Sequence, residues 1–374
     1  MNKLGIVTVG RSDFSILKQF IQSIQKQRID FTIFASTAHF ANEFGYTANE
    51  IFSSFDKKYV YKINADIEID SPINLSNSIS MHIKLFAEGF KKNNIQSLVL
   101  LGDRFETFAA ATAATALMID IIHLHGGVNT LGSMDNAFRN SISEMSKFHF
   151  VDNINAKNRL IKKDFPKSRV FFLGSLGVES IKAAKSISKE KFFMDVFESK
   201  ASFPFAVATF HPSTKFKKND AQIVINIIKA VTEKGLNLLF TFPNSDINNA
   251  HIINCLIKEE KLNSLLTIKK NLGGNLYYSA LKQSEFMIGN SSSGIIESSA
   301  CGIPAINIGN RQEGRDRNLN TIDSGESKAE ILKSIHKIYR DSFTKYAFKQ
   351  DIYFKKGSAE FLVNKLIKII KVRH

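Results

Sequence analysis

Short apolar runs alternate along this chain with longer stretches in which apolar residues recur every three or four positions. The run Leu4–Val9, for example, precedes the helical pattern Phe14–Lys26. Repeated alternation of strand and helix predicts a parallel sheet, because parallel strands need a crossover between them. In the first half this pattern predicts strands at Leu4–Val9, Phe31–Ala35, Tyr59–Ile63, Ser97–Leu101, Ile119–His123, Phe148–Val151 and Val170–Phe172, and further helices at Asn77–Lys91 and Phe105–Leu117.

The alternation loosens between residues 175 and 200, in a lysine-rich helical stretch, and then resumes. The second series predicts strands at Phe205–Thr209, Leu238–Thr241, Ser264–Ile268, Phe286–Ile288 and Ala305–Ile308. We therefore predict an α/β protein with two Rossmann-like domains, over residues 1–175 and 176–357. Ligands of such sheets bind beyond the carboxyl ends of the strands, so we expect the site in the cleft between the halves.

Composition narrows the class of protein. With 374 residues, of which 44% are apolar, the chain is long enough for two domains with their own cores. Its two cysteines, Cys255 and Cys301, lie far apart in the sequence, which argues against a disulfide scaffold or a zinc site. The apolar run at the N-terminus is too brief for a signal peptide, and no stretch is long enough to span a bilayer. We expect a soluble, cytoplasmic protein.

The formal net charge of +15 comes from 50 Lys and Arg against 35 Asp and Glu, and such an excess attracts anionic partners. The basic residues are scattered and no nucleic-acid-binding motif accompanies them, so no nucleic acid partner is predicted. The exception is the tail Asn364–Arg373, where lysines recur every three residues beside apolar positions. This basic amphipathic helix could make weak contact with a membrane surface, although docking onto the protein itself is favoured.

Polar residues follow the predicted strands of the first half. After the first strand come Gly10, Arg11 and Asp13; Arg11 could meet a phosphate, and Asp13 could cap the next helix. Asp103 follows the fourth strand and opens a helix, so it is either an N-cap or a catalytic carboxylate.

Two further pairs follow in the first half. His123 and His125 end the fifth strand two residues apart, so we expect both imidazoles on one face. No third ligand is evident, and we interpret them as hydrogen-bonding groups rather than metal ligands. Asp135 and Arg139 lie four residues apart at a helix start and form either part of the site or an ordinary surface pair.

The second half repeats the arrangement. His211 ends one strand before a proline, Asn244 follows the next strand, and Arg311 and Arg315 follow the last. The most informative stretch is Gly289–Glu297, where an apolar run ends in serines and glycines and then enters a helix that Gly302 closes. It is either an ordinary capped helix or a turn whose backbone N–H groups cradle a phosphate while Glu297 accepts hydrogen bonds from a ribose.

Taken in order, these motifs resemble the hydrolysing UDP-N-acetylglucosamine 2-epimerases of sialic and legionaminic acid biosynthesis. The resemblance spans nearly the whole chain, and it is specific in Gly10–Asp13, Gly102–Phe105, His211-Pro212, Pro243-Asn244, Gly289–Glu297 and Gly302–Arg315. It implies a GT-B fold, a C-terminal helix over about 358–374 that packs on the N-terminal domain, and a homo-oligomer. It implies neither a redox cofactor nor an obligatory metal.

The resemblance also implies a reaction: loss of a proton from sugar C2, departure of the nucleotide diphosphate, and addition of water to the resulting glycal. UDP is the favoured nucleotide and GDP the alternative. The implied catalytic residues are Asp103, Asp135, His125 and His211, of which the two aspartates would be the acid/base carboxylates. The implied substrate-binding residues are Gly10, Arg11, Ser15, Asn244, Ser291, Ser292, Gly294, Glu297, Arg311 and Arg315.

The chain departs from the family pattern where the sugar chemistry is expected. Val128 and Asn136 stand where members usually carry carboxylates, and Asn140 stands where they usually carry a histidine. These departures leave two alternatives open. One is a GT-B glycosyltransferase that uses a UDP-sugar, and the other is a non-catalytic nucleotide-sugar sensor.

Overall fold

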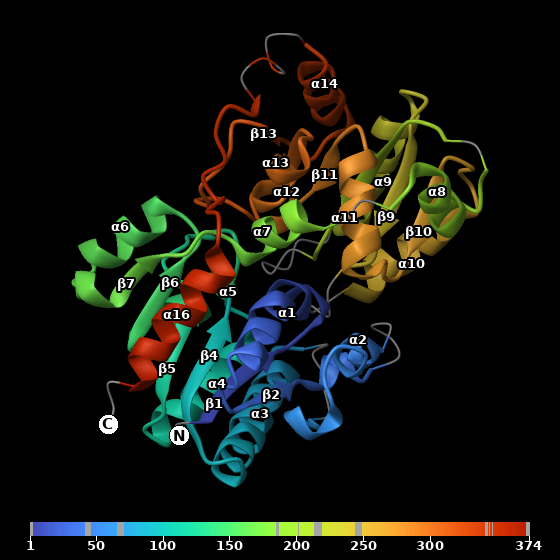
Figure 1. The fold of residues 1–374 in the computed structure, drawn as a ribbon. Helices are drawn as coiled ribbons and strands as arrows, with labels where there is room; N and C mark the ends of the chain where they lie inside the picture. The colour runs from blue at the N-terminus through green and yellow to red at the C-terminus, as the bar shows by residue number, and fades with distance from the viewer. Residues whose placement is uncertain are drawn as a thin grey trace. The chain divides into compact units, whose positions relative to one another are not determined.

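A computed structural model describes residues 3–41, 46–65, 71–184, 187–200, 202–212, 219–243, 249–340, 343, 345 and 347–371. The side chain of Arg11 is outside this description, as is the whole of Asn244. The chain divides into two compact units (Figure 1). Unit 1 comprises Met1–Asn129, Met134–Ser180 and Tyr353–His374, and unit 2 comprises Thr130–Ser133 and Ile181–Ile352.

Unit 1 is built on a parallel sheet of seven strands in the order β3-β2-β1-β4-β5-β6-β7. The strands are β1 Lys3–Thr8, β2 Phe31–Ala35, β3 Val60–Lys62, β4 Ile95–Leu101, β5 Asp120–Leu124, β6 Phe148–Val151 and β7 Val170–Phe172. The chain order reverses between β1 and β4, and their crossovers leave toward opposite edges of the sheet. Ligands bind at such switch points, which here lie beside Gly10 and Gly102.

Helices cover the sheet of unit 1 because its strands are apolar on both faces. Two separate apolar clusters result, one around Phe14, Phe20 and Val99 and the other around Phe86, Phe90 and Leu100. The helices of this unit are α1 Arg11–Lys26, α2 Ala48–Phe52, α3 Pro72–Lys92, α4 Phe105–Ala116, α5 Asp135–Met145, α6 Ile154–Lys162 and α16 Ser358–Lys371. Helix α7, Leu176–Ala183, begins in unit 1 and ends in unit 2.

The C-terminal helix α16, red in Figure 1, packs against α1. Its side chains Leu362, Val363 and Leu366 are buried in the same cluster as α1. The carboxylate of Glu179 accepts hydrogen bonds from the backbone N–H groups of Ser358 (3.0 Å) and Ala359 (2.8 Å). These are N–H groups of the first turn, which lack partners within the helix, so Glu179 caps α16.

Unit 2 has a six-stranded parallel sheet in the order β10-β9-β8-β11-β12-β13. The strands are β8 Phe205–Thr209, β9 Asn237–Thr241, β10 Leu266–Lys269, β11 Met287–Gly289, β12 Ala305–Ile308 and β13 Thr321–Ser324. The helices are α8 Lys189–Phe197, α9 Asp220–Thr232, α10 Asn249–Glu260, α11 Gly273–Gln283, α12 Ser292–Ile296, α13 Ser298–Cys301 and α14 Lys328–Ile338. The order reverses between β8 and β11, which places His211 and the serine turn at the switch point.

The α/β architecture with two parallel sheets is confirmed, and two details differ from the sequence prediction. The helix predicted to run through Glu297 is divided at that residue into α12 and α13. The strand β13 was not predicted, because Thr321–Ser324 is a short, largely polar segment at the edge of the sheet.

Among the described residues, no helix is long and apolar enough to cross a membrane.

Candidate functional site

Asp103 lies in the turn between β4 and α4, and its carboxylate pairs with Arg139 of α5. The side chain of Asp103 is 20% exposed and that of Arg139 is 4% exposed. A buried guanidinium therefore holds a carboxylate that keeps access to solvent. The residue at the N-cap of α4 is Arg104, so the capping interpretation of Asp103 is wrong. Arg139 also donates a hydrogen bond to the carbonyl of Val128 at 3.0 Å.

Asp135 is the first residue of α5, one helical turn before Arg139. A carboxylate in the first turn is stabilised by the helix dipole. The interpretation of Asp135 and Arg139 as an ordinary surface pair is wrong for Arg139, which is buried and bonded to Asp103.

The asparagines at the two departures on α5 contact one another and a lysine. Asn140 donates to the backbone carbonyl of Asn136 at 2.9 Å, and its side-chain oxygen accepts from Lys163 at 3.0 Å. At neither position is there a carboxylate or an imidazole to transfer a proton.

Val128 differs from the other departures, because its side chain is directed into the protein. It is 2% exposed and belongs to an apolar cluster with Val151, Ala156, Leu160 and Val170. A carboxylate at this position would be buried among aliphatic groups.

The two histidines occupy different backbone conformations. Strand β5 ends at Leu124, and His125 follows in the left-handed region with φ 64°. Alternation along a strand therefore does not apply to His125, and the reason for expecting both imidazoles on one face is wrong. His123 is fully buried, with Nε2 2.8 Å from the carbonyl of Gly102 and Nδ1 3.1 Å from Oγ of Ser143.

At the switch point of unit 1, α1 begins at Arg11, with extended Gly10 at its N-cap. The space where a side chain at Gly10 would lie is open within 4 Å, so a ligand could approach the backbone there. Asp13 is not the cap, contrary to expectation, but lies in the first turn. Burial raises the pKa of Asp13 to about 6, although the charge of Arg104 opposes the shift. Ser15 lies on the same helix.

In unit 2 the serine turn joins β11 to α12. Gly289 has φ 135°, and a Cβ there would lie 2.0 Å from the carbonyl oxygen of Thr209, so only glycine fits between β11 and β8. Ser291 is the N-cap of α12, and its hydroxyl accepts a hydrogen bond from the N–H of Ser293 at 3.4 Å. Ser292 begins the helix and Gly294 is buried within it.

Glu297 ends a chain of hydrogen bonds that begins on another helix. Tyr277 of α11 donates to Oγ of Ser293 at 2.7 Å, and Ser293 in turn donates to the carboxylate of Glu297. Burial raises the pKa of Glu297, and the hydrogen bond from Ser293 opposes this shift. These hydrogen bonds orient the carboxylate through one of its oxygens, and a carboxylate has further lone pairs with which to accept from a ligand.

Asn290 connects three segments around the turn. Its side chain accepts from the N–H of His211 at 2.7 Å and donates to the carbonyl of His211 at 2.8 Å. Its own carbonyl accepts hydrogen bonds from Gln312 at 3.0 Å and from Arg311 at 3.4 Å. His211 and Arg311 are thus both fixed next to the serine turn, as the topology predicts.

For Arg315 no hydrogen bond to the serine turn is found among the described residues. Its Nε is buried, and no hydrogen-bond partner for that atom is found among the described residues. Its place beside a diphosphate stays a prediction, as does the role of Asn244, which lies outside the described residues.

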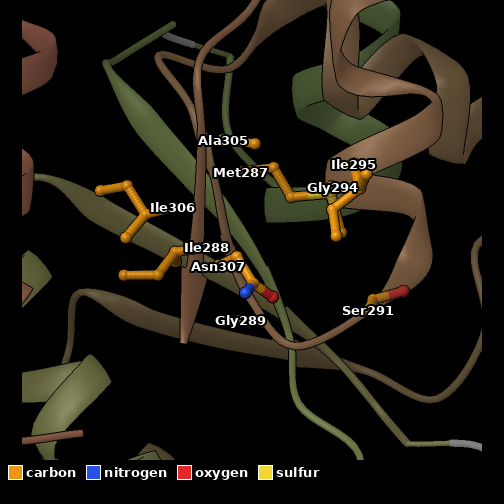
Figure 2. A pocket seen from close by; sticks show the side chains of 9 residues that line it. All are labelled: Met287, Ile288, Gly289, Ser291, Gly294, Ile295, Ala305, Ile306 and Asn307. Carbon is orange, nitrogen blue, oxygen red and sulfur yellow. The ribbon is translucent and has the colours of Figure 1, made fainter. Parts of the chain in front are cut away.

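A small pocket lies between β11, β12 and α12, beside Ser291 of the serine turn (Figure 2). Most of its lining is apolar, and the polar side chains in it are Ser291 and Asn307. Asn307 donates to Asp323 at 2.7 Å, while its buried Oδ1 has no partner in the described part of the chain. The pocket is mainly a packing space between β11, β12 and α12.

No three His, Cys, Asp or Glu side chains gather to hold a metal ion within the described ranges.

Sequence reasoning missed the residues that support the site. Tyr277 lies outside every motif, Gln312 lies inside Gly302–Arg315 without a predicted role, and the side chain of Asn290 acts on His211, which is 79 positions away. A contact of this kind joins strands that are distant in sequence, so spacing along the chain gives no signal for it.

The comparisons with known proteins agree with this geometry. The family model described as UDP-N-acetylglucosamine 2-epimerase matches residues 22–368. The chain is 36% identical over 326 residues to the GDP/UDP-N,N'-diacetylbacillosamine 2-epimerase (hydrolyzing) of Campylobacter jejuni, covering 86% of this chain and 84% of the relative. It is 29% identical to the UDP-N,N'-diacetylbacillosamine 2-epimerase (hydrolyzing) of Legionella pneumophila, covering 93% of this chain and 91% of that one.

Among solved structures, the UDP-GlcNAc 2-epimerase from Neisseria meningitidis bound to UDP-GlcNAc superposes with a TM-score of 0.82 at 16% identity. The match covers 98% of this chain and 100% of that one. The likeness confirms a GT-B-like fold. Because the family model spans most of the chain and the relatives are similar along their length, the chain belongs to the UDP-N-acetylglucosamine 2-epimerase family and is an enzyme of the hydrolysing 2-epimerase type.

Proposed function

We propose that this enzyme hydrolyses a UDP-linked 2-acetamido sugar of the UDP-N-acetylglucosamine type, inverts carbon 2, and releases a free mannosamine-type sugar and UDP. Two relatives named for N,N'-diacetylbacillosamine favour a substrate that carries a second acetamido group at carbon 4 and a deoxy carbon 6. The observation that carries the proposal is the ordered chain Tyr277, Ser293 and Glu297 behind the serine turn. It presents an oriented carboxylate one turn from backbone N–H groups, which suits a ribose and its diphosphate.

In the proposed reaction, unit 2 holds the nucleotide. The hydroxyls of Ser291 and Ser292 and the N–H groups of the turn would bind phosphate, with Glu297 on the ribose. Arg311 would stabilise the diphosphate as it gains charge, and Arg11, Arg315 and Asn244 would support it. Asn290 bonds both the N–H and the carbonyl of His211, so the backbone of His211 is fixed and its imidazole would contact the leaving group from a fixed position.

Unit 1 supplies the acid and base. The proton on sugar C2 passes to a carboxylate, and the C1–O bond to the diphosphate breaks as the C1–C2 double bond forms. Water then adds its hydroxyl to C1, and C2 receives a proton on the opposite face. Asp103 suits the base, because its ion pair with Arg139 holds the carboxylate in place after β4 while the side chain stays partly exposed. Asp135 and His125 would deliver to C2 a proton taken up from solvent, while the proton on Asp103 and the one left by the water pass to solvent.

The glycosyltransferase alternative is not favoured, because the family model and both relatives point to hydrolysing 2-epimerases. The sugar pathway, the use of GDP and a homo-oligomeric state belong to the proposal by the same likeness.

The test is incubation of the purified enzyme in D2O with UDP-N-acetylglucosamine and, separately, with UDP-N,N'-diacetylbacillosamine. We expect UDP and a free manno-configured sugar with deuterium at C2, read by NMR. Release of UDP only when an acceptor is added would replace the proposal with a glycosyltransferase. UDP binding without turnover of either substrate would leave a nucleotide-sugar sensor.

A further inference from the structure

The buried imidazole of His123 connects helix α5 to the turn that carries Asp103. Its Nε2 lies 2.8 Å from the carbonyl oxygen of Gly102, and its Nδ1 lies 3.1 Å from the hydroxyl of Ser143. His123 is fully buried on β5, so neither bond competes with solvent. His123 and Ser143 are not among the acid/base or nucleotide-binding residues of the proposed reaction.

The chemistry of the two partners fixes the tautomer. A backbone carbonyl can only accept, so Nε2 of His123 carries the proton and donates to Gly102. Nδ1 is then the acceptor and receives a hydrogen bond from the hydroxyl of Ser143. Burial lowers the pKa of His123 to about 3, so the ring is neutral near pH 7. A neutral ring can make both bonds at once.

The surrounding backbone leaves room for this ring and little more. A Cβ on Gly126 would lie 2.8 Å from Nδ1 of His123 and 2.9 Å from Oγ of Ser143. The glycine therefore allows the backbone after β5 to pass over the hydrogen bond between these two side chains.

Two side chains of helix α5 act on the turn that contains Gly102 and Asp103. Ser143 acts on Gly102 through His123, and Arg139, one helical turn earlier, acts directly on the carboxylate of Asp103. One bond fixes the peptide before Asp103 and the other fixes its side chain. A carboxylate held at both points has little freedom to leave the position from which it would accept a proton, and misplacement by about 1 Å can cost about 100-fold in rate.

We propose that His123 is a positioning residue, held by Ser143, that orients the Gly102–Asp103 peptide so that the Asp103 carboxylate faces sugar C2. This inference rests on the proposed function for its kinetic consequence, but the order of the turn does not depend on catalysis. The two can therefore be tested apart.

The experiment compares four variants of the full chain. His123→Phe keeps an aromatic ring and removes both hydrogen bonds, whereas His123→Gln keeps a donor for the Gly102 carbonyl. Ser143→Ala removes only the bond to Nδ1. His149→Phe is the matched control: His149 is a buried histidine in register with His123 on the neighbouring strand β6, and its Nδ1 has no hydrogen-bond partner among the described residues.

We expect His123→Phe to lower kcat by about 30- to 100-fold with KM and the Kd for UDP within about threefold, because positioning and not binding is lost. His123→Gln should recover most of the rate, and Ser143→Ala should lower kcat by about three- to tenfold. His149→Phe should stay within about twofold of the wild type.

Hydrogen exchange of the backbone amide of Gly102, which donates to the carbonyl of Leu124 at 3.1 Å, is the readout that needs no turnover. His123→Phe should speed this exchange by at least about tenfold, and His149→Phe should not. If His123→Phe left both the exchange and kcat unchanged, or if His149→Phe sped the exchange and lowered kcat as strongly, the proposal would be overturned. A wild-type enzyme without epimerase activity but with the expected exchange pattern would refute the proposed function and leave the positioning of the turn intact.

Discussion

The substitution Val128→Glu restores the carboxylate that family members usually carry, and the structure predicts that it destabilises the enzyme without raising its activity. The side chain at 128 is packed among Val151, Ala156, Leu160 and Val170, with Phe165 against the same cluster. A glutamate confined there must lose its charge, because its carboxyl would lie among aliphatic groups and the two arginines beside it, Arg139 and Arg159, already donate to the carbonyls of Val128 and Gly127.

The magnitude follows from the pKa that such a glutamate would need. Neutrality at pH 7 requires the pKa to rise from about 4.3 to above 7, and at about 1.4 kcal/mol per unit this costs about 4 kcal/mol. The cost depends on pH with a definite sign. Below about pH 4.3 the glutamate is protonated in both the folded and unfolded states, and as the pH rises only the unfolded state loses the proton, so stability falls. The loss should be about 1 kcal/mol near pH 5 and about 4 kcal/mol near pH 7.

The assay is urea unfolding followed by circular dichroism at about pH 5 and about pH 7, with kcat measured on the folded variant. Val128→Gln is the matched control, because it has the same shape without a titratable proton and its loss of stability should not change between the two pH values. A Val128→Glu enzyme that is as stable as the wild type at pH 7 and turns over faster would show that the side chain at 128 faces the substrate. That result would refute the reasoning.

Three further predictions concern the nucleotide site and the fold. Ser293→Ala removes the hydrogen bond that lowers the pKa of Glu297, so Glu297 of the variant should take up its proton, and the variant should lose UDP affinity, at a higher pH than the wild type. Tyr277→Phe should weaken UDP binding by about 1 kcal/mol without changing the pH at which the affinity falls. Calorimetry at a series of pH values measures both effects. Gly289→Ala should cost at least about 3 kcal/mol in unfolding experiments because its Cβ meets the Thr209 carbonyl, and Gly302→Ala, with φ 74° and open space, should cost only about 1 kcal/mol; equal losses would contradict the steric argument. Glu179→Ala should lower the free energy of unfolding by about 1–2 kcal/mol and speed amide exchange in α16, because the cap of that helix is lost. Glu360 is an exposed carboxylate in the first turn of α16, and Glu360→Ala should do neither.

Much of the fold could be predicted because apolar runs and helical periodicity depend on local sequence. All twelve predicted strands correspond to strands of the structure, with ends that differ by up to a few residues. The missed strand, β13, is stabilised by pairing with β12 rather than by its own apolar residues, and local pattern cannot reveal that. The positions of Asp103, His211 and the serine turn could also be predicted, because topology places strand ends at the switch points.

The contacts of these residues could not be predicted. Arg139 pairs with an aspartate 36 positions away, and its nearer neighbour Asp135 was the partner that helical spacing indicated. The direction of the Val128 side chain could not be predicted either. Alternation along β5 ends at Leu124, and the positive φ angles of His125 and Gly127 turn the chain before residue 128, so the parity of a strand no longer says which side faces the core.

The departures from the family pattern therefore do not all carry the same meaning. Asn136 and Asn140 lie on α5 and offer no proton-transfer group at their own positions, whereas position 128 belongs to the core of unit 1. What remains on α5 is a series at four-residue spacing: Asp135, Arg139 and Ser143. Residues so spaced share one side of a helix, and here the last two fix Asp103 and its peptide while the first is itself a candidate acid. The acid/base geometry of unit 1 thus depends on the placement of a single helix, and a change that shifts α5 should disturb all of these groups together.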